Sequence, residues 1–198
     1  MRPFLAALAL CLLPQAGLAQ ELPLDRISAY LNGLTRAEAD FTQYNADGSV
    51  SSGTVYIHRP GRMRFEYNPP NKALVIAGAG EVAVFDPKSN QPPEQYPLAK
   101  TPLNLILAPH IDLSTAHMVV GHEAQDGSTV VIAQDPKHPD YGTIRMVFSD
   151  NPVALTQWTI SDDAGGQTTV KLSALTPAAT LPDSLFDIGA ATAARRGR

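Results

Sequence analysis

The chain has 198 residues, a formal net charge of −4 and 44% hydrophobic residues. This length suits one domain with a sizeable core. The acidic balance argues against nucleic acid as a partner, because nucleic-acid-binding proteins carry a basic face. We therefore expect a globular protein that binds no nucleic acid.

Residues 1–19, MRPFLAALALCLLPQAGLA, have the organisation of a secretory signal peptide. Arg2 precedes an apolar run, and the run ends in a small-residue cleavage site at Ala19. The run is short and interrupted by Pro14, which argues against a membrane span. Cleavage after Ala19 would leave Gln20 as the new N-terminus and remove one positive charge.

The single cysteine, Cys11, lies inside this predicted signal peptide. A lipoprotein signal places its cysteine at the cleavage point, and Leu10 stands where such signals need a small residue. The expectation is a mature chain without cysteine or disulfide. Lipidation of Cys11 is the alternative.

A helix is predicted at the start of the mature chain, over about residues 23–36, because apolar residues recur there at helical spacing. These residues are Leu24, Ile27, Leu31 and Leu34. A second, short helix is predicted in TPLNLIL, residues 101–107, where Pro102 suits the first helical position. Residues 190–198 are predicted to form a loose, flexible tail.

Short alternating segments separated by turn residues make up most of the remaining chain, which predicts an antiparallel sheet. Residues 41–60 alternate around Asp47-Gly48, a hairpin signal, and Pro60-Gly61 forms a second tight turn. The further strand segments are MRFEYN, ALVIA, VAVFD, HMVVGHEA, STVVIAQD, TIRMVFSD, ALTQWTISD and QTTVKLSAL. The proline-rich KSNQPPEQYP is predicted as a loop. The dry face of such a sheet needs a cover, and the two helices are the candidates.

The motifs of common enzymes and metal proteins are missing from the sequence. GAGEVA, residues 78–83, matches a dinucleotide-loop variant, but the segment after it alternates as a strand instead of opening a helix. No two histidines have the spacing of a zinc site. We therefore expect no cofactor, no metal and no enzyme activity. A hydrolase that uses two scattered carboxylates is the alternative from another class.

Four blocks of the chain resemble the periplasmic outer-membrane lipoprotein carrier family, LolA. They are FTQ (41–43), DGSVSSGTVYIHRPGRMRFEY (47–67), VFDPKSNQ (84–91) and TPLNLIL (101–107). Their order and spacing match the family, and the second half of the chain agrees mainly in its strand rhythm. The GAGEVA segment departs from the Asp-Gly turn and aromatic residue that the family usually has there.

The resemblance implies a mostly β fold: a strongly curved, incomplete antiparallel β-barrel with a few short helices acting as a lid over an apolar cavity. Residues 20–189 would form this single carrier domain. The implied function is a periplasmic chaperone, a monomer that takes the acyl chains of lipoproteins to the outer membrane. The implied partners are acylated lipoproteins, an inner-membrane ABC transporter that releases them, and an outer-membrane acceptor if one exists. An acceptor or a lipoprotein sensor of the same fold is the alternative.

Arg59 follows Val55 and Ile57 on one face of a predicted strand. In the family, the arginine at this position helps to close the lid by hydrogen bonding to lid backbone, and an apolar residue at the position of Met63 lies near the mouth. We therefore predict that Arg59 is a polar latch at the end of the apolar face. An arginine at the sheet rim with its charge in solvent is the alternative.

The predicted cavity and mouth residues are apolar and share strand or helix faces, although which face of each strand turns inward is an inference. They are Val55, Ile57, Met63, Phe65, Tyr67, Leu74, Ile76, Leu103, Ile106, Val130, Ile132, Met146, Phe148 and Trp158.

Overall fold

A computed structural model of the chain describes residues 21–89, 91–162 and 165–196. The predicted signal peptide, Cys11 and the predicted cleavage after Ala19 lie outside the described residues. Within the described part of the chain, no helix is long and apolar enough to cross a membrane.

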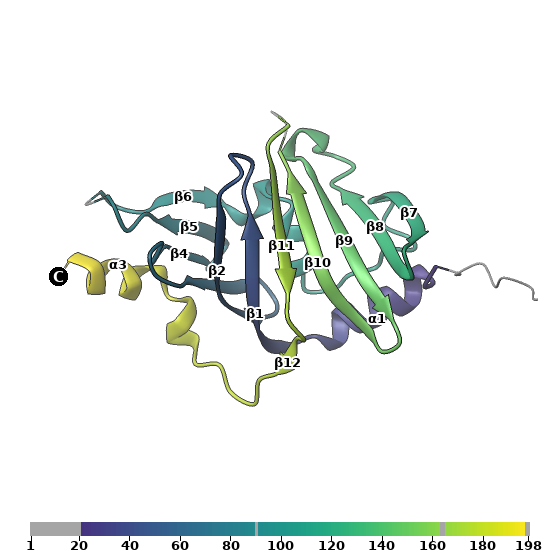
Figure 1. The fold of residues 1–198 in the computed structure, drawn as a ribbon, viewed down its shortest axis with the longest axis horizontal. Coiled ribbons are helices and arrows are strands. Elements are labelled where there is room, and N and C mark those ends of the chain that lie inside the picture. The colour runs from purple at the N-terminus through teal and green to yellow at the C-terminus, as the bar shows by residue number, and fades with distance from the viewer. Residues whose placement is uncertain (1–20, 90, 163–164, 197–198) are drawn as a thin grey trace, which may run out of the picture.

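One 12-stranded antiparallel sheet organises the fold (Figure 1). Its strands follow the order β6-β5-β4-β3-β2-β1-β11-β10-β9-β8-β7, and the short β12 pairs with β1. The strands are β1 (Arg36–Tyr44), β2 (Val50–His58), β3 (Arg62–Tyr67), β4 (Leu74–Gly78), β5 (Glu81–Phe85), β6 (Glu94–Pro97), β7 (Val119–Gln125), β8 (Ser128–Gln134), β9 (Thr143–Asp150), β10 (Val153–Ser161), β11 (Gln167–Leu172) and β12 (Thr176–Pro177). Because β6 and β7 end this order instead of pairing with each other, the curved sheet is an incomplete barrel, as predicted.

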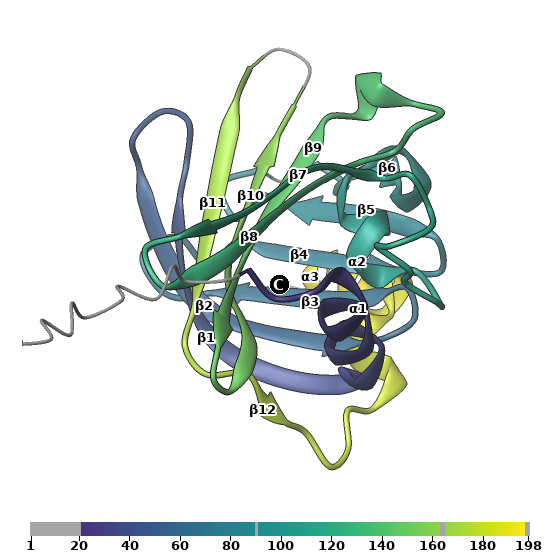
Figure 2. The same ribbon diagram turned by 90° about the vertical axis from the view of Figure 1, so that its right-hand side faces the viewer.

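Among the described residues, three α-helices accompany the sheet: α1 (Leu24–Gly33), α2 (Leu103–Leu107) and α3 (Ile188–Arg196). The 3-10 turns are η1 (Leu98–Lys100), η2 (Pro139–Tyr141) and η3 (Asp183–Phe186). In Figure 2, α1 and α2 lie at the open side of the curved sheet. The first two helices therefore occupy the place predicted for a cover.

The helix predicted over 23–36 ends earlier, at Gly33, because β1 already begins at Arg36. In β1, buried Ala37 and Ala39 alternate with exposed neighbours. The helix prediction rests on a helical spacing whose last residue is Leu34, and it overlaps β1 only at Arg36.

Two segments without a clear hydrophobic pattern form regular structure. β6 lies inside the predicted proline-rich loop, and all four of its residues are exposed. The predicted loose tail over 190–198 contains most of α3, whose Ile188 and Ala191 pack against apolar residues of the sheet. Edge strands and alanine-rich helices bury few large side chains, so neither element produced a strong periodic signal.

The turns predicted from glycine pairs are confirmed. The β1–β2 hairpin closes at Asp47-Gly48, with Gly48 at φ 80°. GAGE forms the tight turn between β4 and β5, where Ala79 and Gly80 have φ of 50° and 82°. The segment that resembles a dinucleotide loop is therefore a hairpin turn.

Apolar side chains form two clusters on opposite faces of the sheet. The larger cluster lies on the concave face and includes buried residues of α1 and α2. The smaller cluster lies on the convex face, where Leu74, Ile76, Ala83 and Phe85 of the sheet meet Leu181 and Phe186 of the C-terminal segment. Each face of this part of the sheet thus has its own cover.

Candidate functional site

The concave face is covered by α1 and by residues 103–113, which together are called the lid below. Their most deeply buried apolar residues are Ile27, Leu31, Ile106, Leu107, Ile111 and Leu113, each at most 5% exposed. They belong to the same cluster as the inward-facing residues of the sheet. The lid therefore shields the apolar face from water.

Most of the predicted cavity residues lie together on this concave face. Val55, Ile57, Met63, Phe65, Met146, Phe148 and Trp158 are buried sheet residues of the larger cluster, Tyr67 and Leu103 are partly buried against it, and Ile106 belongs to it from the lid. Their contact with acyl chains stays a prediction.

Leu74 and Ile76 lie on the opposite, convex face, which corrects their assignment to the cavity. The register sets Met63 against Ala77 and Phe65 against Val75, so Val75 and Ala77 are the β4 residues on the concave side. Since LVIA is apolar at consecutive positions, its pattern could not decide which residues face inward.

Val130 and Ile132 are misplaced for the same reason. In β8, Val131 lies opposite Met146 and Ala133 lies opposite Ile144 on the concave face. Val130 and Ile132 alternate with them and lie on the convex face. The segment VVIA is again apolar without interruption.

Arg59 follows directly after β2 and is only 8% exposed. Its Nη1 donates to the carbonyl oxygen of Leu31 in the last turn of α1. Its Nη2 donates to the carbonyl oxygen of Ala108, which follows α2, at 2.6 Å, and lies 3.5 Å from Asn32 Oδ1. The side chain thus reaches lid backbone and is not exposed at the sheet rim, and its role as a latch stays a prediction.

The chemistry of helix ends explains why a cation fits at this point. Carbonyl groups of the last helical turn lack a full set of intrahelical partners, and the C-terminal end of a helix carries partial negative charge. Burial lowers the pKa of the Arg59 guanidinium, although the group stays charged in proteins. The charged guanidinium is therefore stabilised by its hydrogen bonds to the lid carbonyls.

The tight turn after Arg59 adds two backbone contacts to the lid region. Arg59 N donates to Thr35 O at 2.8 Å, and Gly61 N donates to Leu107 O at 2.9 Å. Gly61 has φ of 70°, a conformation that glycine adopts without a Cβ penalty. Thr35 lies just after α1, so the β2–β3 turn is bonded to α1 itself only through the side chain of Arg59, and to the other lid segment also through Gly61.

Two polar residues of α1 that the sequence analysis missed join the parts of the lid to each other. Asn32 Nδ2 donates to Ile111 O at 2.7 Å, and Ile111 N donates to Asn32 Oδ1 at 3.0 Å. Leu113 N donates to Ser28 Oγ at 3.0 Å. Their spacing of four residues, beside the apolar stripe of the helix, was the available signal.

Two tyrosines place hydroxyl groups at the edge of the concave cluster. Tyr30 of α1 accepts a hydrogen bond from Leu155 N at 3.0 Å. Tyr67 donates to Gln43 Oε1 at 2.6 Å, and burial raises the pKa of Tyr67 to about 12. At these two points the apolar face therefore ends in hydrogen-bonded hydroxyl groups.

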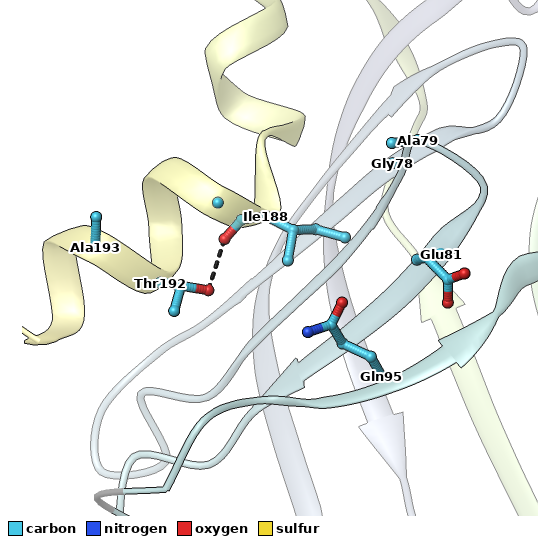
Figure 3. A pocket seen from close by; sticks show the side chains of 8 residues that line it. Gly78, Ala79, Glu81, Gln95, Ile188, Thr192 and Ala193 are labelled. Atoms are coloured by element: carbon cyan, nitrogen blue, oxygen red, sulfur yellow. Dashed lines mark hydrogen bonds between the residues drawn. The ribbon is translucent and has the colours of Figure 1, made fainter.

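A separate groove of about 610 Å³ lies between α3 and the β4–β5 turn (Figure 3). Its lining is formed by Gly78, Ala79, Glu81, Gln95, Ile188, Gly189, Thr192 and Ala193. It contains none of the predicted site residues, and half of its lining comes from α3. It is distinct from the surface under the lid.

These features define an open-barrel protein whose apolar concave face is covered by a lid, and the lid backbone accepts hydrogen bonds from the buried side chain of Arg59. The family model described as outer membrane lipoprotein carrier protein LolA matches residues 32–189, and the chain belongs to this family.

Individual relatives agree over nearly the whole chain. The outer-membrane lipoprotein carrier protein of Chromohalobacter salexigens is 27% identical over 182 residues, covering 85% of this chain and 84% of the relative. That of Chromobacterium violaceum is 27% identical over 195 residues, covering 93% and 91%. A solved LolA superfamily protein from Nitrosomonas europaea has a TM-score of 0.48 at 10% identity, covering 84% of this chain and 98% of the other.

Proposed function

We propose that this protein is a periplasmic chaperone that binds the acyl chains of lipoproteins released from the inner membrane and carries them to the outer membrane. Membership of the lipoprotein carrier family supports this function. The observation that carries the proposal is the pairing of an apolar concave face with a lid held at its edge by Arg59.

The energetics of acyl chains require such a face. Each methylene exposed to water costs about 0.8 kcal/mol, so a protein that carries several chains must provide a large dry surface. In this structure, the lid side chains pack against this surface. Acyl chains would replace the lid side chains when the lid moves away. The apolar face of the sheet would then be covered both with and without cargo.

Arg59 is suited to a role in both states. In the empty protein its donors are bonded to Leu31 O and Ala108 O, and lid movement would free them. Ester and amide oxygens near the lipidated cysteine of a cargo protein are acceptors of the same kind. The lid and the cargo would then compete for one guanidinium, which gives the carrier a way to release what it holds.

The proposal includes a monomer without catalytic activity. Its partners are the acylated lipoproteins, the inner-membrane ABC transporter that releases them, and an outer-membrane acceptor where one exists. Residues 20–189 form the carrier domain, and the chain reaches the periplasm by means of its signal peptide.

Gel filtration of the protein with a purified lipoprotein tests this function. The lipoprotein is added in detergent, which is then diluted away, and a second cargo has serine in place of its lipidated cysteine. We expect a one-to-one complex with the acylated cargo and none with the serine variant. If neither cargo, or both equally, co-elute with the protein, acyl-chain carriage is wrong.

A further inference from the structure

The side chains of Ser28 and Asn32, one helical turn apart on α1, bind the backbone of the other lid segment. Asn32 forms two hydrogen bonds with Ile111, of 2.7 and 3.0 Å, and Ser28 accepts one from Leu113 at 3.0 Å. Ser28 also donates to Leu24 O at 2.7 Å, which fixes its hydroxyl group. Ile111 and Leu113, two residues apart, direct their backbone groups to the same side, as in a β-strand, and side chains of α1 take the place of the neighbouring strand.

These bonds satisfy polar groups that lie in a dry environment. Ile111 and Leu113 are 1% and 3% exposed, and Ser28 is 8% exposed. If α1 moved away while residues 111–113 stayed, two amides and a carbonyl would lose their partners inside an apolar cluster. A buried polar group without a partner is costly, so separation inside the lid is unfavourable.

The bonds between the lid and the sheet are placed differently. Arg59 reaches one carbonyl of each lid segment, at Leu31 and Ala108. Tyr30 accepts from Leu155 of β10, and Gly61 donates to Leu107. Arg59 and Gly61 belong to the β2–β3 turn and Leu155 belongs to β10, so these bonds join the lid to the sheet and not to itself.

We propose that Ser28 and Asn32 are positioning residues that couple α1 to residues 108–113, so that the two segments leave the sheet as one body. This inference rests on the proposed function, because the movement is the one that admits cargo. Its consequence is that Arg59 loses Leu31 O and Ala108 O in the same step. The apolar face is then uncovered in one transition and not in two.

Two amides of the sheet region report separately on the two parts of the lid. Leu155 N–H lies where the register of β10 shifts, and it donates to Tyr30 of α1. Gly61 N–H donates to Leu107 at the end of α2. Each amide becomes open to solvent exchange when its part of the lid departs, and neither is bonded to Ser28 or Asn32.

Hydrogen exchange of these two amides, resolved by NMR in the protein without cargo, tests the coupling. In the unaltered protein we expect one shared opening free energy for both, smaller than that of global unfolding in urea. In the double variant Ser28→Ala/Asn32→Ala, we expect the two protection factors to separate by about tenfold, the size of one or two lost hydrogen bonds. Asn45→Ala/Ser49→Ala is the matched control, because this pair is also hydrogen-bonded but lies in the β1–β2 turn.

The proposal is overturned if the two amides differ in the unaltered protein, if they exchange only with global unfolding, or if they stay equal in the Ser28/Asn32 variant. A merely structural role would lower the urea midpoint while both amides continued to change together. Because this measurement uses no lipoprotein, its failure is distinct from a failure of cargo binding in gel filtration.

Discussion

Arg59 and Leu31 lie 28 positions apart in the chain, and the guanidinium of Arg59 donates to the main-chain carbonyl of Leu31 under the buried lid. The next arginines of the hairpin bind the other cover: Arg62 reaches Asp183 at 2.5 Å, and Arg64 reaches Leu185 O at 2.8 Å. One hairpin thus holds the lid on one face of the sheet and the C-terminal segment on the other.

Replacing Arg59 by leucine is expected to loosen the lid and leave the sheet folded. The change removes charged hydrogen bonds to Leu31 O and Ala108 O, each contributing about 1.5–3 kcal/mol. Hydrogen exchange of the α1 amides should accelerate at least about tenfold. Arg64→Leu is the control, because it removes a similar bond from the convex face and should affect residues 181–186 instead. Unchanged exchange in α1 of Arg59→Leu would show that this residue does not hold the lid.

The two faces of the sheet should respond differently to truncation. Met63→Ala on the concave face and Ile76→Ala on the convex face each remove a fully buried side chain and should each cost about 2–5 kcal/mol of unfolding free energy. Only Met63→Ala is expected to change the amount of acylated lipoprotein bound per folded molecule. Equal effects of both variants on binding would contradict the assignment of faces.

The sequence pattern predicted much of this architecture, because strands with one wet face alternate and glycine turns separate them. It could not assign the faces of β4 and β8, since LVIA and VVIA are apolar on both sides. Both sides of β4 are in fact buried, one by the lid cluster and one by the C-terminal segment. The C-terminal segment that covers β4 lies more than 100 positions away in the chain, so the local sequence of β4 does not indicate that this face is buried.

Of the residues that bind the lid backbone, the sequence indicated Arg59 but not Ser28 and Asn32. Arg59 is visible in sequence as a charged residue that continues an apolar face and matches the family at that position. Ser28 and Asn32 have ordinary side chains on an amphipathic helix, and their lid partners are backbone groups 85 and 79 positions away, respectively. Backbone partners have no residue type, so the sequence does not identify them.

Gly53 is expected to tolerate no side chain. A Cβ at this buried position of β2 would overlap the carbonyl oxygen of Glu66 and lie 2.9 Å from Tyr67 Cα, both backbone atoms of β3. Gly53→Ala should therefore cost about 1–3 kcal/mol of unfolding free energy, measured by urea denaturation. The matched change Gly33→Ala meets no atom within 4 Å and should be neutral or stabilising. The reverse order of these two stabilities would contradict the close approach of β2 and β3.

His58 should make the stability depend on pH. Its Nε2 lies 3.2 Å from Arg36 Nε and 3.1 Å from Arg62 Nη2, and burial, followed by these two arginines, lowers the pKa of His58. The unfolded chain binds a proton near pH 6.5, whereas the folded protein does so only at lower pH. This contribution to stability is therefore present above about pH 6.5 and is lost as the pH falls below it, by at most about 1.4 kcal/mol per pH unit.

Urea midpoints of His58→Gln and the unaltered protein, compared between about pH 7.5 and 5.5, measure this component. The difference between the two proteins should shift in favour of the variant as the pH falls. His110→Gln is the control, because His110 is exposed. A pH-independent difference for His58→Gln would show that His58 does not titrate differently on folding.

We expect the lid to move away from the apolar face when acyl chains bind, and the distance between α1 and β1 measures this movement. Residues 20–198 contain no cysteine, so spin labels can be attached at Ala29→Cys on α1 and Glu38→Cys on β1, both of which are exposed positions. Double electron–electron resonance then gives the distance between the two spin labels in three samples: with acylated lipoprotein, with its cysteine-to-serine variant, and without cargo. We predict a longer distance with the acylated cargo alone. An unchanged distance in a complex that holds acylated cargo would show that the lid does not move when acyl chains bind.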